Sequence, residues 1–200
     1  MATIIYLHGF GSIGESPKSL ALKSSFPDHT VLFPDLPVDP LEMLDTVLPL
    51  YYRAKSSPVL FVGTSLGGFW AAYFAELLGE IGIIVNPSAT PSVGMQARVG
   101  AEVKNYKTGE PIVITDEIVD RYKHAEDLLF SKYTGDRIYS FFAKNDNVLD
   151  CYETMKKFRT FKSCSVFESG GHRFDLYWPV VISDIAKILE NLTHYVYKYK

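Results

Sequence analysis

Basic charge, cysteine and long apolar runs are all scarce in this chain of 200 residues, and each shortage excludes a class of protein. The 20 Lys and Arg against 23 Asp and Glu leave a net charge of −3, so no basic field favours nucleic acid or an anionic membrane surface. Two cysteines, Cys151 and Cys164, are too few for a disulfide framework and are typical of a reducing compartment. No apolar run approaches the ~18 residues of a membrane span.

Signals for secretion and for metal binding are also lacking. The start of the chain, MATIIYLHGFGS, has neither the basic lead nor the long apolar core of a signal peptide, which together with the cysteine count predicts a cytoplasmic protein. His8, Asp146 and His172 show no metal-ligand spacing, so we expect no metal and no cofactor. The length fits a single domain over residues 1–200, because a chain of this size buries about 70% of its unfolded surface.

Short apolar runs alternate with helical patterns along most of the chain. The runs indicate six strands, at 3–7, 30–33, 58–62, 81–85, 137–143 and 163–167. Their near-continuous apolar character is typical of parallel strands that are buried on both faces. We therefore predict an α/β fold, in which about six parallel strands carry helices on both faces through right-handed crossovers.

Helix signals lie between these runs. Ser16 before Pro17 predicts the start of one helix, Asp39 before Pro40 predicts another, and residues 178–192 form a closing helix. Residues 86–136 break the alternation, and we expect turns with one or two short helices there. A long excursion from a compact sheet often forms a lid or a pocket wall, with plain surface packing as the alternative.

A lone serine lies between two glycines where the third apolar run meets the next helical pattern. Gly63-Thr64-Ser65-Leu66-Gly67 matches G-x-S-x-G, in which a sharp strand-to-helix turn projects the serine hydroxyl above the sheet. The amide of Leu66 would lie at a helix N-terminus and could donate to an oxyanion. Ser65 is therefore a candidate nucleophile; the alternative is a serine that merely caps the helix.

A serine nucleophile needs a base, and the base needs an orienting acid. His172 follows the sixth predicted strand and the flexible pair Gly170-Gly171, so we expect it to be the base. Asp146 lies in the loop after the fifth strand and is the expected acid. Asp150 is the alternative, although its position just before a helical pattern favours an N-cap. The order Ser, Asp, His is that of α/β-hydrolases.

The loop after the first strand, YLHGFGS, is expected to supply a second oxyanion donor. A turn at Gly9 would leave the amide of Phe10 free to point into the site. In a doubly wound sheet this loop and the serine turn would flank the point where the strand order reverses, which is where ligands usually bind. We expect His8 to shape this loop through hydrogen bonds rather than to act in catalysis.

Six segments resemble one known family. IIYLHGFGS, VGTSLGGFWA, IVNPSATP, NYKTGE, NDNVLD and GGHRF are similar to the α/β-hydrolase superfamily and, within it, to the YqiA-like small bacterial esterase family. The resemblance extends from about residue 3 to 175. It implies a minimal α/β-hydrolase fold without a large cap domain, with Ser65, Asp146 and His172 as the triad and the amides of Phe10 and Leu66 as the oxyanion hole.

The function that these observations predict is hydrolysis of short acyl esters through an acyl-enzyme. Acyl thioesters or acyl transfer, and a non-catalytic binding role on the same fold, are the alternatives. The expected partner is a small acyl ester, and we expect a monomer or a small homo-oligomer. Apolar candidates for the pocket wall are Phe10, Phe69, Pro87, Val148 and Phe174.

Overall fold

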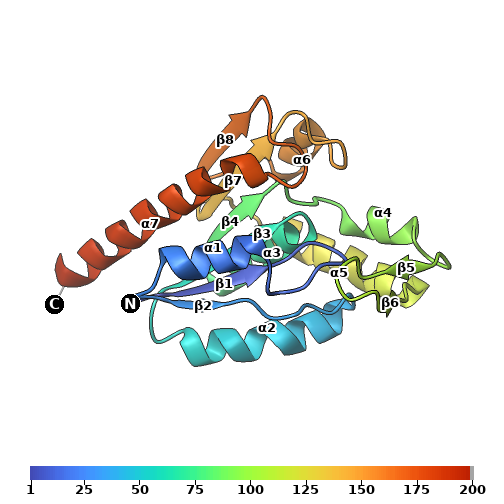
Figure 1. Cartoon of the computed structure of the whole chain (residues 1–200), viewed down its shortest axis with the longest axis horizontal. Helices are drawn as coiled ribbons and strands as arrows, with labels where there is room; N and C mark the ends of the chain where they lie inside the picture. The colour runs from blue at the N-terminus through green and yellow to red at the C-terminus, as the bar shows by residue number, and fades with distance from the viewer. Residues whose placement is uncertain (199–200) are drawn as a thin grey trace.

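A parallel sheet of six strands forms the centre of the computed structural model, which describes residues 1–198 (Figure 1). All six strands run in the same direction, in the order β2-β1-β3-β4-β7-β8. The predicted α/β fold is confirmed, and each predicted strand is present. The six strands are β1 (Thr3–Leu7), β2 (Thr30–Leu32), β3 (Val59–Thr64), β4 (Ile81–Val85), β7 (Ile138–Ala143) and β8 (Ser163–Phe167).

Seven α-helices and one short 3₁₀ helix are described around this sheet. Ser16 and Asp39 are the N-caps of α1 and α2, as their positions predict. The last helix is six residues longer than predicted. The helices are α1 (Pro17–Ser25), α2 (Pro40–Ala54), α3 (Leu66–Leu78), α4 (Pro91–Gln96), α5 (Asp116–Lys132), α6 (Cys151–Phe158), η1 (Asp175–Tyr177) and α7 (Trp178–Lys198).

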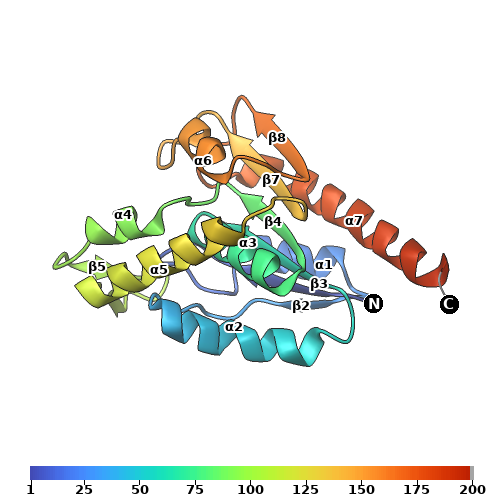
Figure 2. The same cartoon turned by 180° about the vertical axis from the view of Figure 1, so that it is seen from behind.

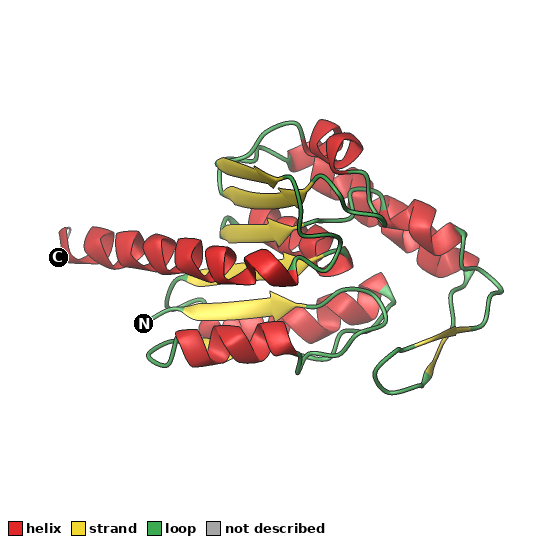
Figure 3. Cartoon of the chain, turned by 45° about the horizontal axis from the view of Figure 1, so that its top comes forward, coloured by secondary structure: helices red, strands yellow, loops and turns green. Residues whose placement is uncertain are grey.

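Alternate side chains of each strand enter two separate cores, because successive residues of a strand point to opposite faces. In β1, Ile5 and Leu7 join a core with α2, α3 and α5, whereas Ile4 and Tyr6 join a second core with α1 and α7. Figure 3 shows these helical layers on either side of the strands. Burial on both faces explains why the central strands are almost wholly apolar.

Residues 86–136 leave the sheet between β4 and β7, as the sequence indicates. They contain α4, a two-stranded antiparallel hairpin of β5 (Val103–Lys104) and β6 (Pro111–Ile112), and α5. The expectation of short helices alone was wrong, because α5 has 17 residues and packs Val119, Tyr122 and Leu129 into the core beneath α3. Figures 1 and 2 show α4, the hairpin and one end of α5 together, beyond the strand ends.

The strand order reverses between β1 and β3. The chain passes from β1 outward to β2 and then returns across β1 to β3, so the loops after β1 and β3 lie on opposite sides of this reversal. Ligands bind at such a reversal, outside the carboxyl ends of the strands. Within residues 1–198, no helix is long and apolar enough to cross a membrane.

Candidate functional site

The turn between β3 and α3 is tight enough to force Ser65 into an unusual backbone conformation. Ser65 has φ 56° and ψ −122°, a region that non-glycine residues rarely occupy. A Cβ on Gly63 would lie 1.9 Å from the carbonyl oxygen of Gly67, and one on Gly67 would lie 2.0 Å from that of Leu7. The two glycines are therefore required for the turn to close against the end of β1.

The hydroxyl of Ser65 does not cap the helix that follows it. No hydrogen bond joins it to the first turn of α3, which argues against the capping alternative. Its Oγ instead lies 3.0 Å from Nε2 of His172. Gly9 borders the same hydroxyl, since a Cβ there would lie 3.8 Å from Oγ. The turn thus presents the hydroxyl to a loop from the other half of the chain.

His172 is held between Ser65 and a carboxylate. It lies in the loop after β8, and Gly170 and Gly171 before it have φ 124° and 59°. The Nδ1 of His172 lies 2.8 Å from Oδ2 of Asp146 and 3.1 Å from Oδ1. The structure therefore brings the three residues that the sequence singled out into one line of hydrogen bonds; their catalytic roles stay predictions at this point.

Asp146 is buried and surrounded by donors. Its side chain is 1% exposed, and Oδ1 accepts hydrogen bonds from the amides of Val148 (2.8 Å) and Leu149 (3.0 Å). Burial acts to raise the pKa of Asp146, but the hydrogen bonds from His172 and from these amides outweigh it and hold the pKa below its usual value. The carboxylate is therefore ionised at neutral pH and can orient an imidazole.

Asp150, the alternative acid, has a different role. Its Oδ1 accepts from the amides of Tyr152 (2.8 Å) and Glu153 (3.1 Å), so it is the N-cap of α6. The geometry therefore supports Asp146, and not Asp150, as the partner of His172.

Two backbone amides beside Ser65 have no acceptor among the described residues. They are the N–H groups of Phe10, in the turn after β1, and of Leu66, at the start of α3. Both residues line the same cavity of about 250 Å³. An unpaired amide at a helix N-terminus is suited to bind developing negative charge. Phe10 and Leu66 thus lie at one cavity, and their oxyanion role stays a prediction.

His8 shapes the loop that carries Phe10. The Leu36 amide donates to its Nε2 (2.9 Å), so Nδ1 holds the proton and donates to the carbonyl oxygen of Gly9 (2.8 Å). Burial lowers the pKa of His8, which keeps the ring neutral in this arrangement. Both ring nitrogens are bonded to backbone, as expected for a structural histidine.

The β5–β6 hairpin forms one wall of the cavity. Asn105 donates from Nδ2 to the carbonyl oxygen of Ser12 (2.8 Å), and the Tyr106 amide donates to that of Gly11 (3.0 Å), so the hairpin is tied to the loop of Phe10. The cavity is lined by His8, Gly9, Phe10, Gly11, Ser12, Leu36, Pro37, Val38, Glu42, Met43, Leu66, Asn105, Pro111, Ile112 and Val113.

The predicted pocket wall is wrong at two of its five residues. Of its five residues only Phe10 lines this cavity, whereas Phe69 and Phe174 are fully buried in the two cores. Sequence reasoning missed Ile112 and Met43. The turn-forming segment NYKTGE was the available signal, because its hydrogen bonds to the loop after β1 bring the hairpin to the cavity. Among the described residues, no group of three or more His, Cys, Asp or Glu is arranged to hold a metal ion.

The fold recurs in solved structures of low sequence identity. Est1E from Butyrivibrio proteoclasticus with bound ferulic acid superposes with a TM-score of 0.71 at 13% identity, covering 97% of this chain and 90% of that chain. Mouse alpha/beta hydrolase domain-containing protein 10 gives 0.70 at 14% identity, covering 95% and 90%. A soluble variant of the monoglyceride lipase of Saccharomyces cerevisiae gives 0.66 at 11% identity, covering 96% and 86%.

Sequence relatives share one family. A Yersinia enterocolitica UPF0227 protein is 24% identical over 176 residues, which cover 86% of this chain and 90% of the relative. A Shewanella relative is 26% identical over 192 residues, covering 92% and 96%. A Vibrio cholerae relative is 30% identical over 146 residues, covering 62% and 82%. The pattern of the uncharacterised protein family UPF0227 matches residues 3–186. The chain therefore belongs to this family, the YqiA-like family that its motifs resemble, and has the α/β-hydrolase fold.

Proposed function

We propose that this protein is a serine hydrolase that cleaves short acyl esters through an acyl-enzyme. The observation that carries the proposal is the line of hydrogen bonds from Ser65 Oγ through His172 to Asp146, at 3.0 Å and 2.8 Å. A neutral imidazole in this position can accept the serine proton while an ionised carboxylate holds its tautomer. The similarity to esterase and lipase folds is consistent with this chemistry.

The proposed reaction uses this arrangement in two steps. His172 Nε2 takes the Ser65 proton as Oγ attacks the ester carbonyl, and the amides of Phe10 and Leu66 donate to the resulting oxyanion. The imidazolium then protonates the leaving alcohol, which leaves an acyl group on Oγ. A water molecule, deprotonated by His172, attacks that acyl group; collapse of the second oxyanion returns the proton to Oγ and releases the acid. Asp146 stays ionised throughout.

The cavity favours an uncharged and short acyl group. Its wall is slightly more apolar than polar, and the one carboxylate among its lining residues, Glu42, would repel an anionic chain. A volume of about 250 Å³ is small, at the lower end of ordinary ligand sites. We therefore place the acyl part of the substrate beneath the hairpin, next to the amides of Phe10 and Leu66.

The test compares wild type with Ser65→Ala on p-nitrophenyl acetate, butyrate and octanoate. Loss of the nucleophile should lower kcat by on the order of 10⁶, by analogy with subtilisin, a protease of unrelated fold with the same kind of triad. Ser131→Ala removes an exposed serine of α5 and is the matched control, with unchanged turnover. Equal activity in wild type and Ser65→Ala would refute the mechanism.

A fluorophosphonate probe separates the remaining outcomes. Its phosphorus is attacked by Ser65 Oγ with release of fluoride, so wild type should be labelled and Ser65→Ala should not. Labelling together with cleavage of acyl thioesters alone would make the protein a thioesterase. A wild-type protein that is neither labelled nor active would point to a binding role.

A further inference from the structure

Asn86 has a strained backbone at the end of β4. It follows Val85 directly, has φ 41° and is 3% exposed. Asparagine is one of the few non-glycine residues that tolerates a positive φ. Its amide donates to the carbonyl oxygen of Phe141 (2.9 Å), so the strained residue is fixed against β7. A buried, strained and polar residue at this edge of the sheet needs a reason.

The side chain of Asn86 joins the two segments that carry Asp146 and His172. Its Oδ1 accepts from the amide of Ala143 (2.9 Å), the last residue of β7. Its Nδ2 donates to the carbonyl oxygens of Gly171 (2.9 Å) and of His172 itself (3.1 Å). One carboxamide therefore satisfies a donor from one segment and two acceptors from the other.

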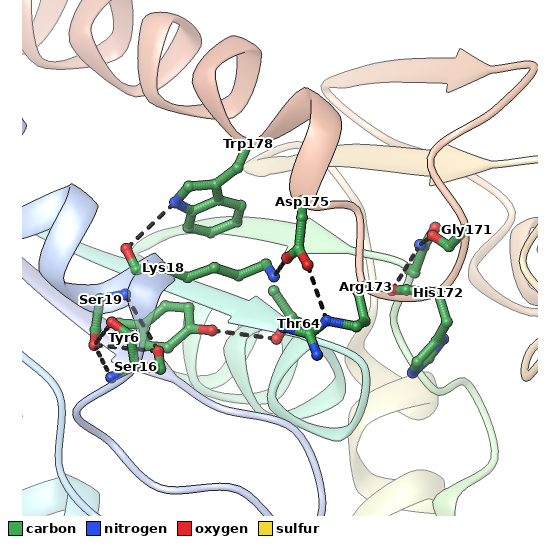
Figure 4. A network of polar contacts seen from close by, with 11 residues as sticks. Tyr6, Ser16, Lys18, Ser19, Thr64, Gly171, His172, Arg173, Asp175 and Trp178 are labelled. Atoms are coloured by element: carbon green, nitrogen blue, oxygen red, sulfur yellow. Dashed lines mark hydrogen bonds and ion pairs between the residues drawn. The ribbon is translucent and has the colours of Figure 1, made fainter.

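The loop of His172 relies on such anchors. Gly170 and Gly171 both have positive φ, and because glycine has no side chain, neither residue can fix the backbone before the imidazole through side-chain contacts. On the exposed side, Asn145 Oδ1 accepts from the Gly171 amide (2.8 Å). Past the imidazole, Asp175 forms ion pairs with Lys18 of α1 and with Arg173, which Figure 4 shows beside His172. Asn86 is the anchor that bonds to the backbone of His172 itself.

We propose that Asn86 is a positioning residue that keeps Nε2 of His172 within reach of Ser65 and Nδ1 against Asp146. This inference rests on the proposed function, in which His172 is the base. The carboxamide supplies in one group the acceptor that the Ala143 amide needs and the two N–H donors that the carbonyl oxygens of Gly171 and His172 need. A carboxylate of the same shape would keep the acceptor for Ala143. Its second oxygen would face the carbonyl oxygens of Gly171 and His172, so two hydrogen bonds would be replaced by repulsion.

The test variant is therefore Asn86→Asp, with Ser140→Ala as the matched control. Ser140 is also buried, lies on β7 and donates to the carbonyl oxygen of Ser163 at the start of β8, away from the imidazole. We expect Asn86→Asp to lower kcat for p-nitrophenyl acetate by about 10- to 100-fold, because small misplacements of a catalytic group cost this much. KM should change less than about threefold, since the cavity is untouched. Ser140→Ala should have a kcat within about twofold of that of wild type, although its loss of thermal stability should be similar to that of Asn86→Asp.

A second readout does not depend on turnover. The Nδ1 proton of His172, hydrogen-bonded to Asp146, should give a downfield proton resonance in NMR spectra of wild type and of Ser140→Ala. It should be broadened or lost in Asn86→Asp. If Asn86→Asp does not fold, Asn86→Gly suits the positive φ, removes the whole side chain with its carboxamide and should show the same two losses.

Three results would overturn the inference. One is a kcat within twofold of wild type together with an intact resonance in Asn86→Asp or Asn86→Gly. Another is an equal fall of kcat in Ser140→Ala, which would indicate general destabilisation. The third arises if wild type cleaves no ester, in which case the proposed function fails and the resonance alone decides the role of Asn86. An Asn86→Asp protein that keeps the resonance then refutes positioning, and one that loses it supports positioning.

Discussion

Backbone strain gathers at the ends of the strands that carry the site. Among the described non-glycine residues, Ser65, Asn86, Arg159 and Phe174 have positive φ; Ser65 and Asn86 directly follow β3 and β4, and Phe174 lies in the longer loop between β8 and η1. Each such residue costs on the order of 1–3 kcal/mol and persists only where its surroundings hold it. Asn86 is held by its hydrogen bonds, and Phe174 by burial between Phe167 and Tyr177. Strain here indicates side chains that must point in one particular direction.

At this scale the sequence predicted residues that obey local rules. Ser65 lies in a five-residue motif and Asp150 directly precedes a helical pattern. A short stretch of sequence was therefore enough to predict the turn at Ser65 and the N-cap at Asp150. Asn86 obeys no local rule, because its partners Ala143 and His172 are 57 and 86 residues away. Spacing carries no information about contacts of that kind.

The substitution Gly67→Ala tests how closely α3 approaches β1. The new Cβ would lie 2.0 Å from the Leu7 carbonyl oxygen, and backbone cannot move aside as a side chain can. We expect the free energy of unfolding to fall by about 3 kcal/mol, as for severe overpacking. Urea unfolding followed by circular dichroism measures it.

Gly94→Ala in α4 is the matched control. Its Cβ would have only Arg98 Nη1 within 4 Å, at 3.5 Å. Alanine favours helix over glycine, so this variant should be more stable than wild type by up to about 1 kcal/mol. Equal stability of the two variants would show that the close approach of α3 is unimportant.

The β5–β6 hairpin is the element that sequence patterns describe least well. Its strands have two residues each, too few for alternation to show. The excursion itself was predictable, because its turn-rich composition interrupts the regular alternation of strands and helices. What the hairpin contacts depends on hydrogen bonds from Asn105 and Tyr106 to the loop after β1, more than 90 residues earlier.

The substitution Ile112→Trp tests the hairpin as a pocket wall. A larger side chain there should fill part of the cavity that Ile112 lines. We expect kcat/KM for p-nitrophenyl octanoate to fall at least about 10-fold while that for the acetate stays within twofold, since a pocket distinguishes chain lengths by about this factor.

Val93→Trp places the same side chain on α4, where Val93 is 67% exposed. It should leave kcat/KM unchanged for both the acetate and the octanoate. Equal losses for acetate and octanoate in Ile112→Trp would remove the hairpin from the acyl site.

At the scale of the whole molecule, the strand content was predictable and the strand order was not. Each central strand is apolar because both of its faces are covered, and that requirement is visible in a short window of sequence. Pairing such as β4 with β7 joins segments more than 50 residues apart, and apolar strands are interchangeable by pattern alone. The serine motif and the order of the loops after the strands predicted the arrangement around the site, and the resemblance to a known family agreed with it.

The stability of the whole fold should fall at high pH. Burial raises the pKa of Tyr6 to about 12, despite its hydrogen bond with Thr64. Between pH 10 and 12 the unfolded chain loses this proton and the folded protein keeps it, so the free energy of unfolding falls as pH rises. Tyr6 alone should contribute a fall of about 3 kcal/mol over that interval.

Urea unfolding of Tyr6→Phe and of wild type between pH 9 and 12 isolates this contribution. The variant should show a shallower decline, because phenylalanine has no proton to lose. Tyr152→Phe, at a position that is 57% exposed, should decline as wild type does. Parallel curves for wild type and Tyr6→Phe would contradict the assignment to Tyr6.

The exposed turn at Gly100 divides the chain into two complementary pieces. The first piece holds β1 to β4 with Ser65 and both unpaired amides, and the second holds β7 and β8 with Asp146 and His172. In the sheet the division falls between β4 and β7, and the two pieces also meet where α5 packs beneath α3 and where the hairpin bonds to the loop after β1. In the proposed chemistry neither fragment would release product alone, and the rate from a mixture of the two would report how many pairs had reassembled.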